Sequence, residues 1–223
     1  MNLVRAQELL GEWLPQLLVA AGGTLRITAG AFVLASLMGL LLAFGRLSRR
    51  GWLARASLIY IETIRGVPAL TLLFLLYFAL ASGGIVMHAF QAAVVGLGLN
   101  GAAYLAEVYR AGIQSIHAGQ REAAQSVGMN WAQMMRYIIL PQAMRVVLPP
   151  LVNYLIALLK ETSIASLIAA PELTNRARDL SSEYFMPMQL YLLTGLMYFL
   201  MAYPLSRAAR FLEARMTRMS MID

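Results

Sequence analysis

The sequence predicts an all-α integral membrane protein, a helical bundle of five transmembrane helices with a short helix in one of its cytoplasmic connections. Two observations carry this prediction. Of the 223 residues, 60% are hydrophobic and only 13% are charged, with a mean hydropathy of +0.65. A soluble domain has about a quarter charged residues, so lipid must cover part of this surface. In addition, the charge-free runs are long enough to span a bilayer and end beside arginines, which excludes a soluble enzyme.

The charge-free runs set the number of spans, because a spanning helix needs about 20 apolar residues. The run from Gly66 to Ala106 is too long for one helix, and Ser82-Gly83-Gly84 divides it into two. The first of these two must begin near Leu58, so that Glu62 and Arg65 enter its opening turns. The predicted spans are therefore 27–45, about 58 to the break at 82–84, 85–107, 137–159 and 184–206.

Arginine placement predicts the orientation of the chain. The connections and tail on one side of the five spans carry eleven arginines, against five basic residues on the other side. Because cytoplasmic loops are enriched in Arg and Lys, the N-terminus is predicted outside and the C-terminus inside. We expect an external segment at 1–26, a transmembrane domain at 27–210 and a cytoplasmic tail at 211–223.

Several function classes lack their sequence signals. The formal net charge is +7, but no basic stretch is interleaved with aromatic residues, so no nucleic acid partner is expected. With no cysteine, and with His88 and His117 far apart, neither a metal site nor a cofactor is expected. The sequence has no phosphate-binding G-x-x-x-x-G-K-[ST] loop, so the chain is not predicted to hydrolyse ATP by itself.

The longest inner connection, 109–136, shows helical spacing. Ala123, Val127 and Trp131 fall on one face at i, i+4 and i+8, with Arg121, Glu122 and Gln125 turned away. Because Gly119 precedes the segment and Gly128 interrupts it, a short helix with a glycine bend is predicted within about 117–132. On this pattern alone, an amphipathic helix lying on lipid headgroups is an equal alternative.

The same connection resembles a known motif. Glu122-Ala123-Ala124, then Gly128, then Ile138-Ile139-Leu140-Pro141 has the spacing of the EAA signature of permease subunits in bacterial binding-protein-dependent ABC importers. Further segments are similar to the polar amino-acid uptake branch, whereas the first 25 residues and the tail after Arg210 carry no likeness. These segments are 65–68, 103–107, 112–116 and 160–163.

The resemblance implies a subunit of the bacterial inner membrane that forms the pathway for polar amino acids. It implies three kinds of partner: cytoplasmic ATPase subunits, a second permease that is identical or homologous, and an external solute-binding protein. The EAA segment would then be a coupling helix whose small residues allow close approach and whose acid pairs with a basic group of the ATPase. The expected docking residues are Arg121, Glu122, Ala123, Ala124 and Gly128.

Ionisable residues within spans are costly and are functional hypotheses by default. Lys160 and Glu161 follow the Pro149-Pro150 disturbance and precede two hydroxyls, a polar step that suits a water-filled cavity and a zwitterionic substrate, or else marks the outer membrane boundary. The predicted pathway residues are Lys160, Glu161, Thr162, Ser163 and Asn100, the last of which can instead be hydrogen-bonding glue between helices.

Two acid–arginine pairs have i, i+3 spacing near the inner ends of spans. Glu62 with Arg65, and Glu107 with Arg110, are predicted as intramembrane ion pairs that either anchor the helix boundary or act as a gate.

The sequence argues against two rival functions. An ion-gradient-driven secondary transporter or channel would need no ATPase, and the EAA spacing argues against it. An intramembrane enzyme would need a nucleophile and a base in register, and neither histidine lies beside a Gly-x-Ser-x-Gly.

Overall fold

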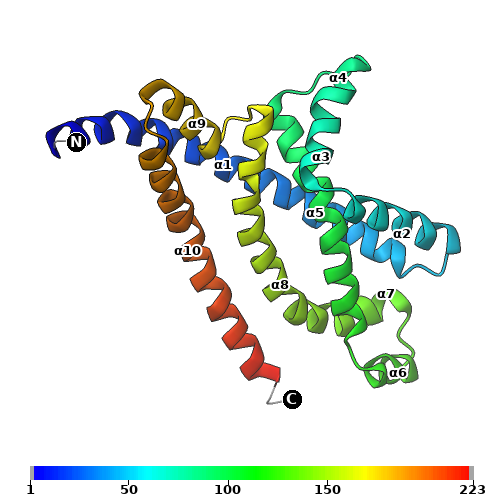
Figure 1. Ribbon diagram of the computed structural model, residues 1–223. Coiled ribbons are helices and arrows are strands. Elements are labelled where there is room, and N and C mark those ends of the chain that lie inside the picture. The colour runs from blue at the N-terminus through cyan, green and yellow to red at the C-terminus, as the bar shows by residue number, and fades with distance from the viewer. Residues whose placement is uncertain (1–2, 221–223) are drawn as a thin grey trace.

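A computed structural model describes residues 3–220 and confirms the all-α fold, with no strand among these residues. Four long helices are apolar enough to cross a membrane by length and composition, and a bent helix pair makes a fifth. In Figure 1, α6 and the C-terminus lie at one end of the bundle, and α4 and α9 lie at the other. The long helices are α1 (Leu3–Arg46), α5 (Ala89–Gln114), α8 (Leu140–Glu161) and α10 (Pro187–Ser220).

The second span is broken rather than straight. Helix α2 (Gly51–Gly66) meets α3 (Ala69–Phe74) at an angle of 103°, and η1 (Leu75–Ala79) and α4 (Leu80–Ser82) continue α3. The bend forms because Pro68 has no N–H to donate and holds Val67 in extended conformation, at φ −106° and ψ 130°. The predicted start of this span near Leu58 is therefore wrong, and Glu62 and Arg65 lie on α2, before the bend.

Two predicted boundaries do not coincide with helix ends. α1 runs without a break past residue 26, since a single exposed arginine does not end a helix. Before that point Trp13, Leu17 and Ala21 pack against α9 (Leu173–Tyr184) and α10. At the other end α10 continues to Ser220, so the predicted tail 211–223 begins inside it, and residues 221–223 lie outside the described part of the chain.

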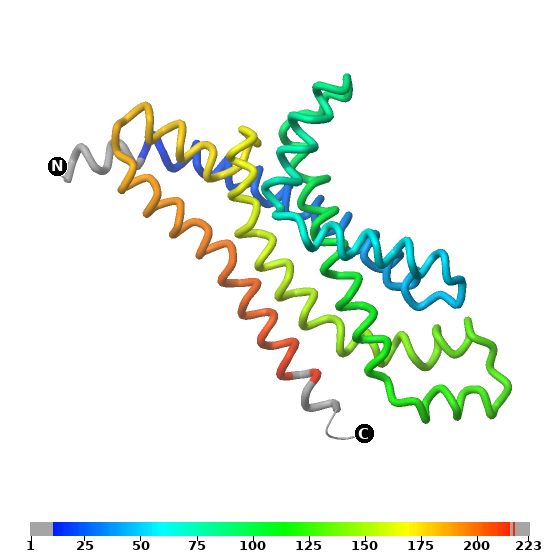
Figure 2. Tube along the Cα trace, turned by 45° about the vertical axis from the view of Figure 1, so that its right-hand side comes forward, coloured from blue at the N-terminus to red at the C-terminus, as the bar shows by residue number. Residues whose placement is uncertain are grey.

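The fourth span is less disturbed than predicted at its centre. Pro149 and Pro150 lie inside α8 without ending it. The irregular backbone lies at its two ends instead, as the π-helical η2 (Met135–Ile139) and the 3-10 helix η3 (Thr162–Ile168). The change of backbone thus comes directly after Glu161. Figure 2 shows α8 and α10 running side by side.

Small residues let α1 and α5 approach each other closely. Ala31, Ala35, Gly39 and Ala43 repeat every four residues on α1, which places them on one face. A Cβ at Gly39 would lie 3.0 Å from the Cβ of Leu105 and 3.1 Å from the Ala102 carbonyl oxygen on α5. Backbone-to-backbone packing of this kind drives association where lipid removes the hydrophobic driving force.

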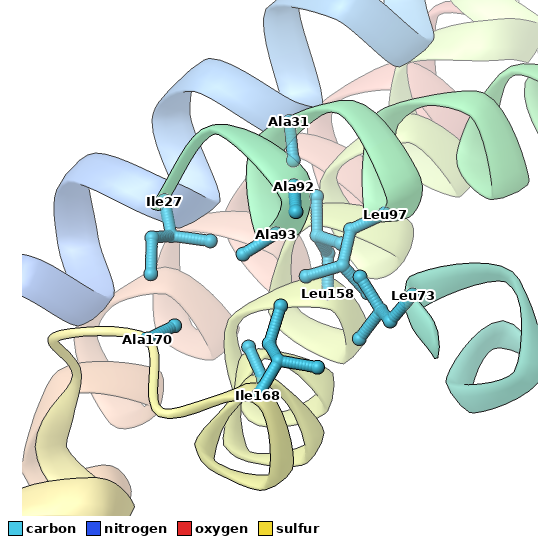
Figure 3. Close-up of a cluster of buried hydrophobic side chains, with 10 residues drawn as sticks. Ile27, Ala31, Leu73, Ala92, Ala93, Leu97, Leu158, Ile168 and Ala170 are labelled. Carbon is cyan, nitrogen blue, oxygen red and sulfur yellow. The ribbon is translucent and has the colours of Figure 1, made fainter. Parts of the chain in front are cut away.

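Larger side chains fill the space around this contact. The cluster in Figure 3 gathers residues of α1, α3, α5 and α8 together with η3 and the turn after it. It therefore ties both halves of the chain together. Its buried members include Ile27, Ala31, Leu73, Ala92, Ala93, Leu97, Leu158, Ile168 and Ala170.

Gly101 tests this packing. An added Cβ would lie 2.8 Å from the ring carbon Cζ of Tyr154 and 2.9 Å from the Cβ of Ala35. We expect Gly101→Ala to lower the stability of the purified protein by about 1–3 kcal/mol, as overpacking does. Thermal unfolding in detergent measures it. Gly195→Ala, whose Cβ meets nothing within 4 Å inside α10, is the matched control and should not lower the midpoint, because alanine favours a helix more than glycine does.

Candidate functional site

The inner connection between α5 and α8 forms a short helix, α6 (Ala118–Ser126). The His117 side chain caps its N-terminus by accepting a hydrogen bond from the Gly119 N–H, at 3.1 Å. A second short helix, α7 (Trp131–Met134), follows and begins with a capping box in which Asn130 and Gln133 bond reciprocally. In Figure 1, α6 lies below the lower ends of the spanning helices α5 and α8.

α6 turns a face toward the spanning helices that differs from the predicted one. Ala124 is buried against Ile113 of α5 and Ile139 of η2. Val127 and Trp131 are 73% and 61% exposed, and they do not share one helix with Ala123, because α6 ends at Ser126. Glu122 and Ala123 are exposed as well. The expected docking residues therefore split, with Ala124 turned inward and Glu122 and Ala123 turned outward.

Arg121 also points inward. It is half-buried, and its guanidinium donates a hydrogen bond to the Ile113 carbonyl, with Nη2 2.9 Å from the oxygen. Glu122, which the spacing places on the same side of the helix as Arg121, is exposed, so these two residues do not share one environment.

Gly128 ends the turn after α6 with a φ of +76°. A Cβ at this position would meet nothing within 4 Å, so lack of space does not explain the glycine. The left-handed conformation does, because a side chain is strained there. The Gly128 and Met129 N–H groups bond to the carbonyls of Gln125 and Ala124, which satisfies the end of α6.

Glu107 and Arg110 form an ion pair on α5, with Nη2 and Oε2 2.6 Å apart. The other carboxylate oxygen of Glu107 lies 3.9 Å from Nε of Arg46, at the end of α1. The pairing expected between Glu62 and Arg65 is absent: both side chains are exposed, and within residues 3–220 no ion pair joins them. Both residues lie on α2, before the bend at Pro68.

The four polar residues at the end of α8, 160–163, differ in how exposed they are. Lys160 is exposed and Glu161 is half-buried, whereas Thr162 is fully buried and donates to the Leu159 carbonyl. Ser163 is half-buried, as is Asn100 on α5. The structure therefore brings Lys160 and Glu161 to accessible positions and gives Thr162 a role in holding the helix end.

A cavity of about 1080 Å³ lies between α5, α8 and α10 on the α6 side of the bundle. Tyr104 lines it, and stacks on Tyr154 at 5.1 Å between ring centroids. The five predicted pathway residues do not line the cavity themselves. Its polar lining comes from Gln120, Gln142, Arg145, Asn153 and Glu213.

Comparison with known proteins identifies the family. Residues 31–218 match the family described as binding-protein-dependent transport system inner membrane component. The chain belongs to this family.

Curated relatives agree with the family match. The chain is 41% identical to the probable amino-acid ABC transporter permease protein YckA of Bacillus subtilis, over 84% of this chain and 83% of that protein. It is 39% identical to the probable glutamine ABC transporter permease protein GlnP of the same organism, over 87% and 90%. A crystal structure of an amino acid ABC transporter with histidines superposes at a TM-score of 0.87 with 37% identity, over 92% of this chain and 96% of that one.

The chain is thus a multi-span inner membrane transport subunit.

Glu172 is a structural residue that the sequence pattern does not single out. Glu172 is fully buried on the side of the bundle opposite α6. Its carboxylate caps α9 by accepting from the Thr174 N–H at 2.8 Å and from the Asn175 N–H, and it accepts from the Tyr198 hydroxyl of α10 at 2.8 Å. A cap acid before an amphipathic helix was the signal in the sequence that could have revealed it.

Glu172 makes the stability of this transport subunit depend on pH. Burial raises the pKa of its carboxyl above the usual 4.5, and outweighs the hydrogen bonds that lower it. The folded chain then holds the proton more tightly than the unfolded chain does. The contribution of Glu172 to the free energy of unfolding is full below the pKa that this carboxyl has in the unfolded chain, and it is lost as the pH rises through the pKa in the folded chain.

We therefore expect the unfolding temperature of the parent, relative to Glu172→Gln, to decline as the pH rises from about 4 toward neutrality. Tryptophan fluorescence during heating measures both. Glu183→Gln, at an exposed acid of the same helix, should track the parent at every pH. A difference that stayed flat or rose with pH would contradict this assignment.

Proposed function

We propose that this chain is the permease subunit of an importer for polar amino acids, and that α6 docks it onto a separate cytoplasmic ATPase. The observation that carries this proposal is the split of α6 into two faces. Ala124 anchors the helix to the spans, while Ala123 and Glu122 face outward beside the exposed Val127. A small apolar surface with one acid suits a groove with a basic rim.

The amino-acid substrate rests on the relatives and on the polar step. The relatives named above carry amino-acid or glutamine in their names. Lys160 and Glu161 offer a cation for a carboxylate and a carboxylate for an ammonium group, and both are accessible to a zwitterion. Glutamine and other polar amino acids are the substrate class we propose.

A second permease, identical or homologous, completes the pathway in this proposal. Asn153 and Lys160 are exposed along α8, and Tyr104 is 49% exposed on α5. Polar groups at such depth are tolerated where they face protein or a water-filled cavity rather than lipid. The exposed polar face of α8 therefore supports a pathway enclosed between two subunits.

The position of α6 supports the proposed orientation of the chain across the membrane. Docking on a cytoplasmic ATPase would put the α6 end, and with it the C-terminus, inside the cell, in agreement with the arginine count. The end that carries α9 then faces outward, toward an external solute-binding protein. The family match favours an ATP-driven importer over the alternative of an ion-gradient-driven transporter.

Gly128 tests the docking role of α6. We expect Gly128→Val to reduce uptake about tenfold or more, because a β-branched side chain at positive φ costs ~1–2 kcal/mol and misdirects the turn. Gly128→Asn is the matched control, since asparagine tolerates this conformation, and should transport within about twofold of the parent. Uptake into proteoliposomes, normalised to permease abundance, measures both. Parental uptake by Gly128→Val would count against the proposed coupling.

Glu161 tests the substrate pathway. Glu161→Gln keeps the size of the side chain and removes its charge, so we expect the apparent affinity for the amino acid to weaken about ten- to a hundredfold. Glu62→Gln, an exposed acid without an ion pair, should leave it unchanged. Concentration-dependent uptake separates affinity from maximal rate. If Glu161→Gln transports with the parental affinity, Glu161 marks the membrane boundary instead.

A further inference from the structure

The last turn of α5 ends close to α6, and three of its backbone carbonyls, those of Ala111, Gly112 and Ile113, have identified hydrogen-bond donors. The last four carbonyls of a helix have no partner within the helix. In α5 the Ala111 carbonyl accepts from the Ser115 N–H at 2.9 Å, and the Gly112 carbonyl accepts from the Ser115 hydroxyl at 2.8 Å. Ile113 is the next residue, and its carbonyl accepts from Arg121 at 2.9 Å. A residue of α6 thus completes the end of a spanning helix.

The hydrogen bond from Arg121 to the Ile113 carbonyl is stronger than a hydrogen bond between neutral groups. The donor is a charged guanidinium, and charge-assisted hydrogen bonds are about twice as strong as neutral ones. It also sits at the C-terminal end of α5, where the helix dipole favours positive charge. Arg121 is half-buried, and it lies beside the cluster that contains Ile113 and Ala124.

We infer that Arg121 is a positioning residue that ties α6 to the end of α5, so that α6 and α5 move as one body when the ATPase moves α6. This inference rests on the proposed docking of α6 and assigns a role within it. The connection between the two helices is only Ser115-Ile116-His117, but three backbone residues without a side-chain tether leave the angle between the helices free to vary. Arg121 removes that freedom. Its side chain is committed to the permease and does not contact the ATPase.

The Arg121–Ile113 hydrogen bond, which we call the tether, is followed along α5 by a contact with α1. Two turns before its C-terminus, α5 carries Glu107, which pairs with Arg110 and lies 3.9 Å from Arg46 of α1. A displacement of α6 would pass through Arg121 to the end of α5 and from there to the α1–α5 pair. α6 also packs on the start of the fourth span, because Ala124 lies against Ile139 of η2, and the Gln142 amide of α8 donates to Gln120 at 3.4 Å. The charge-assisted hydrogen bond of Arg121 is the link that leads to α5.

The absence of cysteine from the chain makes a distance measurement direct. Spin labels at Ala111→Cys on α5 and Gln125→Cys on α6 occupy exposed positions and report the geometry between these helices. Arg121→Gln is then introduced into the labelled permease assembled with its ATPase subunits. We expect a broader distance distribution, ATPase binding within about twofold of the parent, and uptake per ATP hydrolysed lowered about tenfold, equivalent to about 1.4 kcal/mol of lost coupling.

Arg136→Gln is the matched control. It removes an exposed arginine of the same connection, whose guanidinium lies only over the Tyr137 ring, 5.8 Å from its centroid. It should leave the distance, the ATPase binding and the transport ratio unchanged. Arg121→Lys retains the charge with a single-point donor and should recover part of the parental ratio.

The outcomes separate this inference from the proposed function. Loss of ATPase binding in Arg121→Gln with an unchanged distance distribution would mean that Arg121 contacts the ATPase, and would overturn the tether while leaving α6 docking intact. Parental distance, binding and transport ratio would overturn the tether as well. Failure of docking itself would appear instead as a purified permease that does not bind the ATPase although its Arg121 is intact.

Discussion

The close approach of α1 and α5 is the contact on which the rest of the structure depends. Within a membrane the apolar side chains of two helices gain little by leaving lipid, so helices associate through tight packing and hydrogen bonds. The four-residue repeat of small residues on α1 and the facing Ala102 and Leu105 of α5 supply such packing. The broken second span, α8 and η3 then pack around this pair.

This arrangement explains why the functional connection is placed as it is. α5 ends in a turn whose carbonyls are satisfied by Ser115 and by Arg121, so the position of α6 is defined by the end of the most densely packed helix. A helix docked on a partner transmits movement only as far as its own attachment is stiff. Ala124 in the core beneath α6 and the hydrogen bond of Arg121 provide that stiffness at two points.

The parts of this fold that the sequence predicted are those set by long runs or by residue identity. Charge-free runs located the spans, and the spacing around Gly128 located α6, because neither depends on distant contacts. The i, i+4, i+8 spacing does not describe the faces of α6, because the backbone leaves the helix after Ser126 and Trp131 belongs to α7. Likewise, the start of the second span was drawn from polarity, whereas the extended Val67 before Pro68 decides it.

Residues whose roles depend on tertiary contacts were the hardest to predict. Glu172 counted only as one acid of an outer connection, but in the fold its burial and its bonds to α9 and α10 make it an anchor. Arg121 is the converse case. Its position next to Glu122 predicts a surface residue of the docking motif, whereas in the fold its guanidinium bonds to the Ile113 carbonyl at the end of α5.

The proposed second permease subunit finds its support in the exposed polar residues of α8. Asn153 and Lys160 are exposed on α8, and Asn153 lines the cavity between α5, α8 and α10 and donates a hydrogen bond to Glu213 of α10 at 2.9 Å. On another face of α8, Val147 and Leu151 pack against α1 and α5. Lys160 is exposed on α8, where a charge facing lipid would be costly, and this is the physical reason for proposing that a second subunit covers this part of the helix.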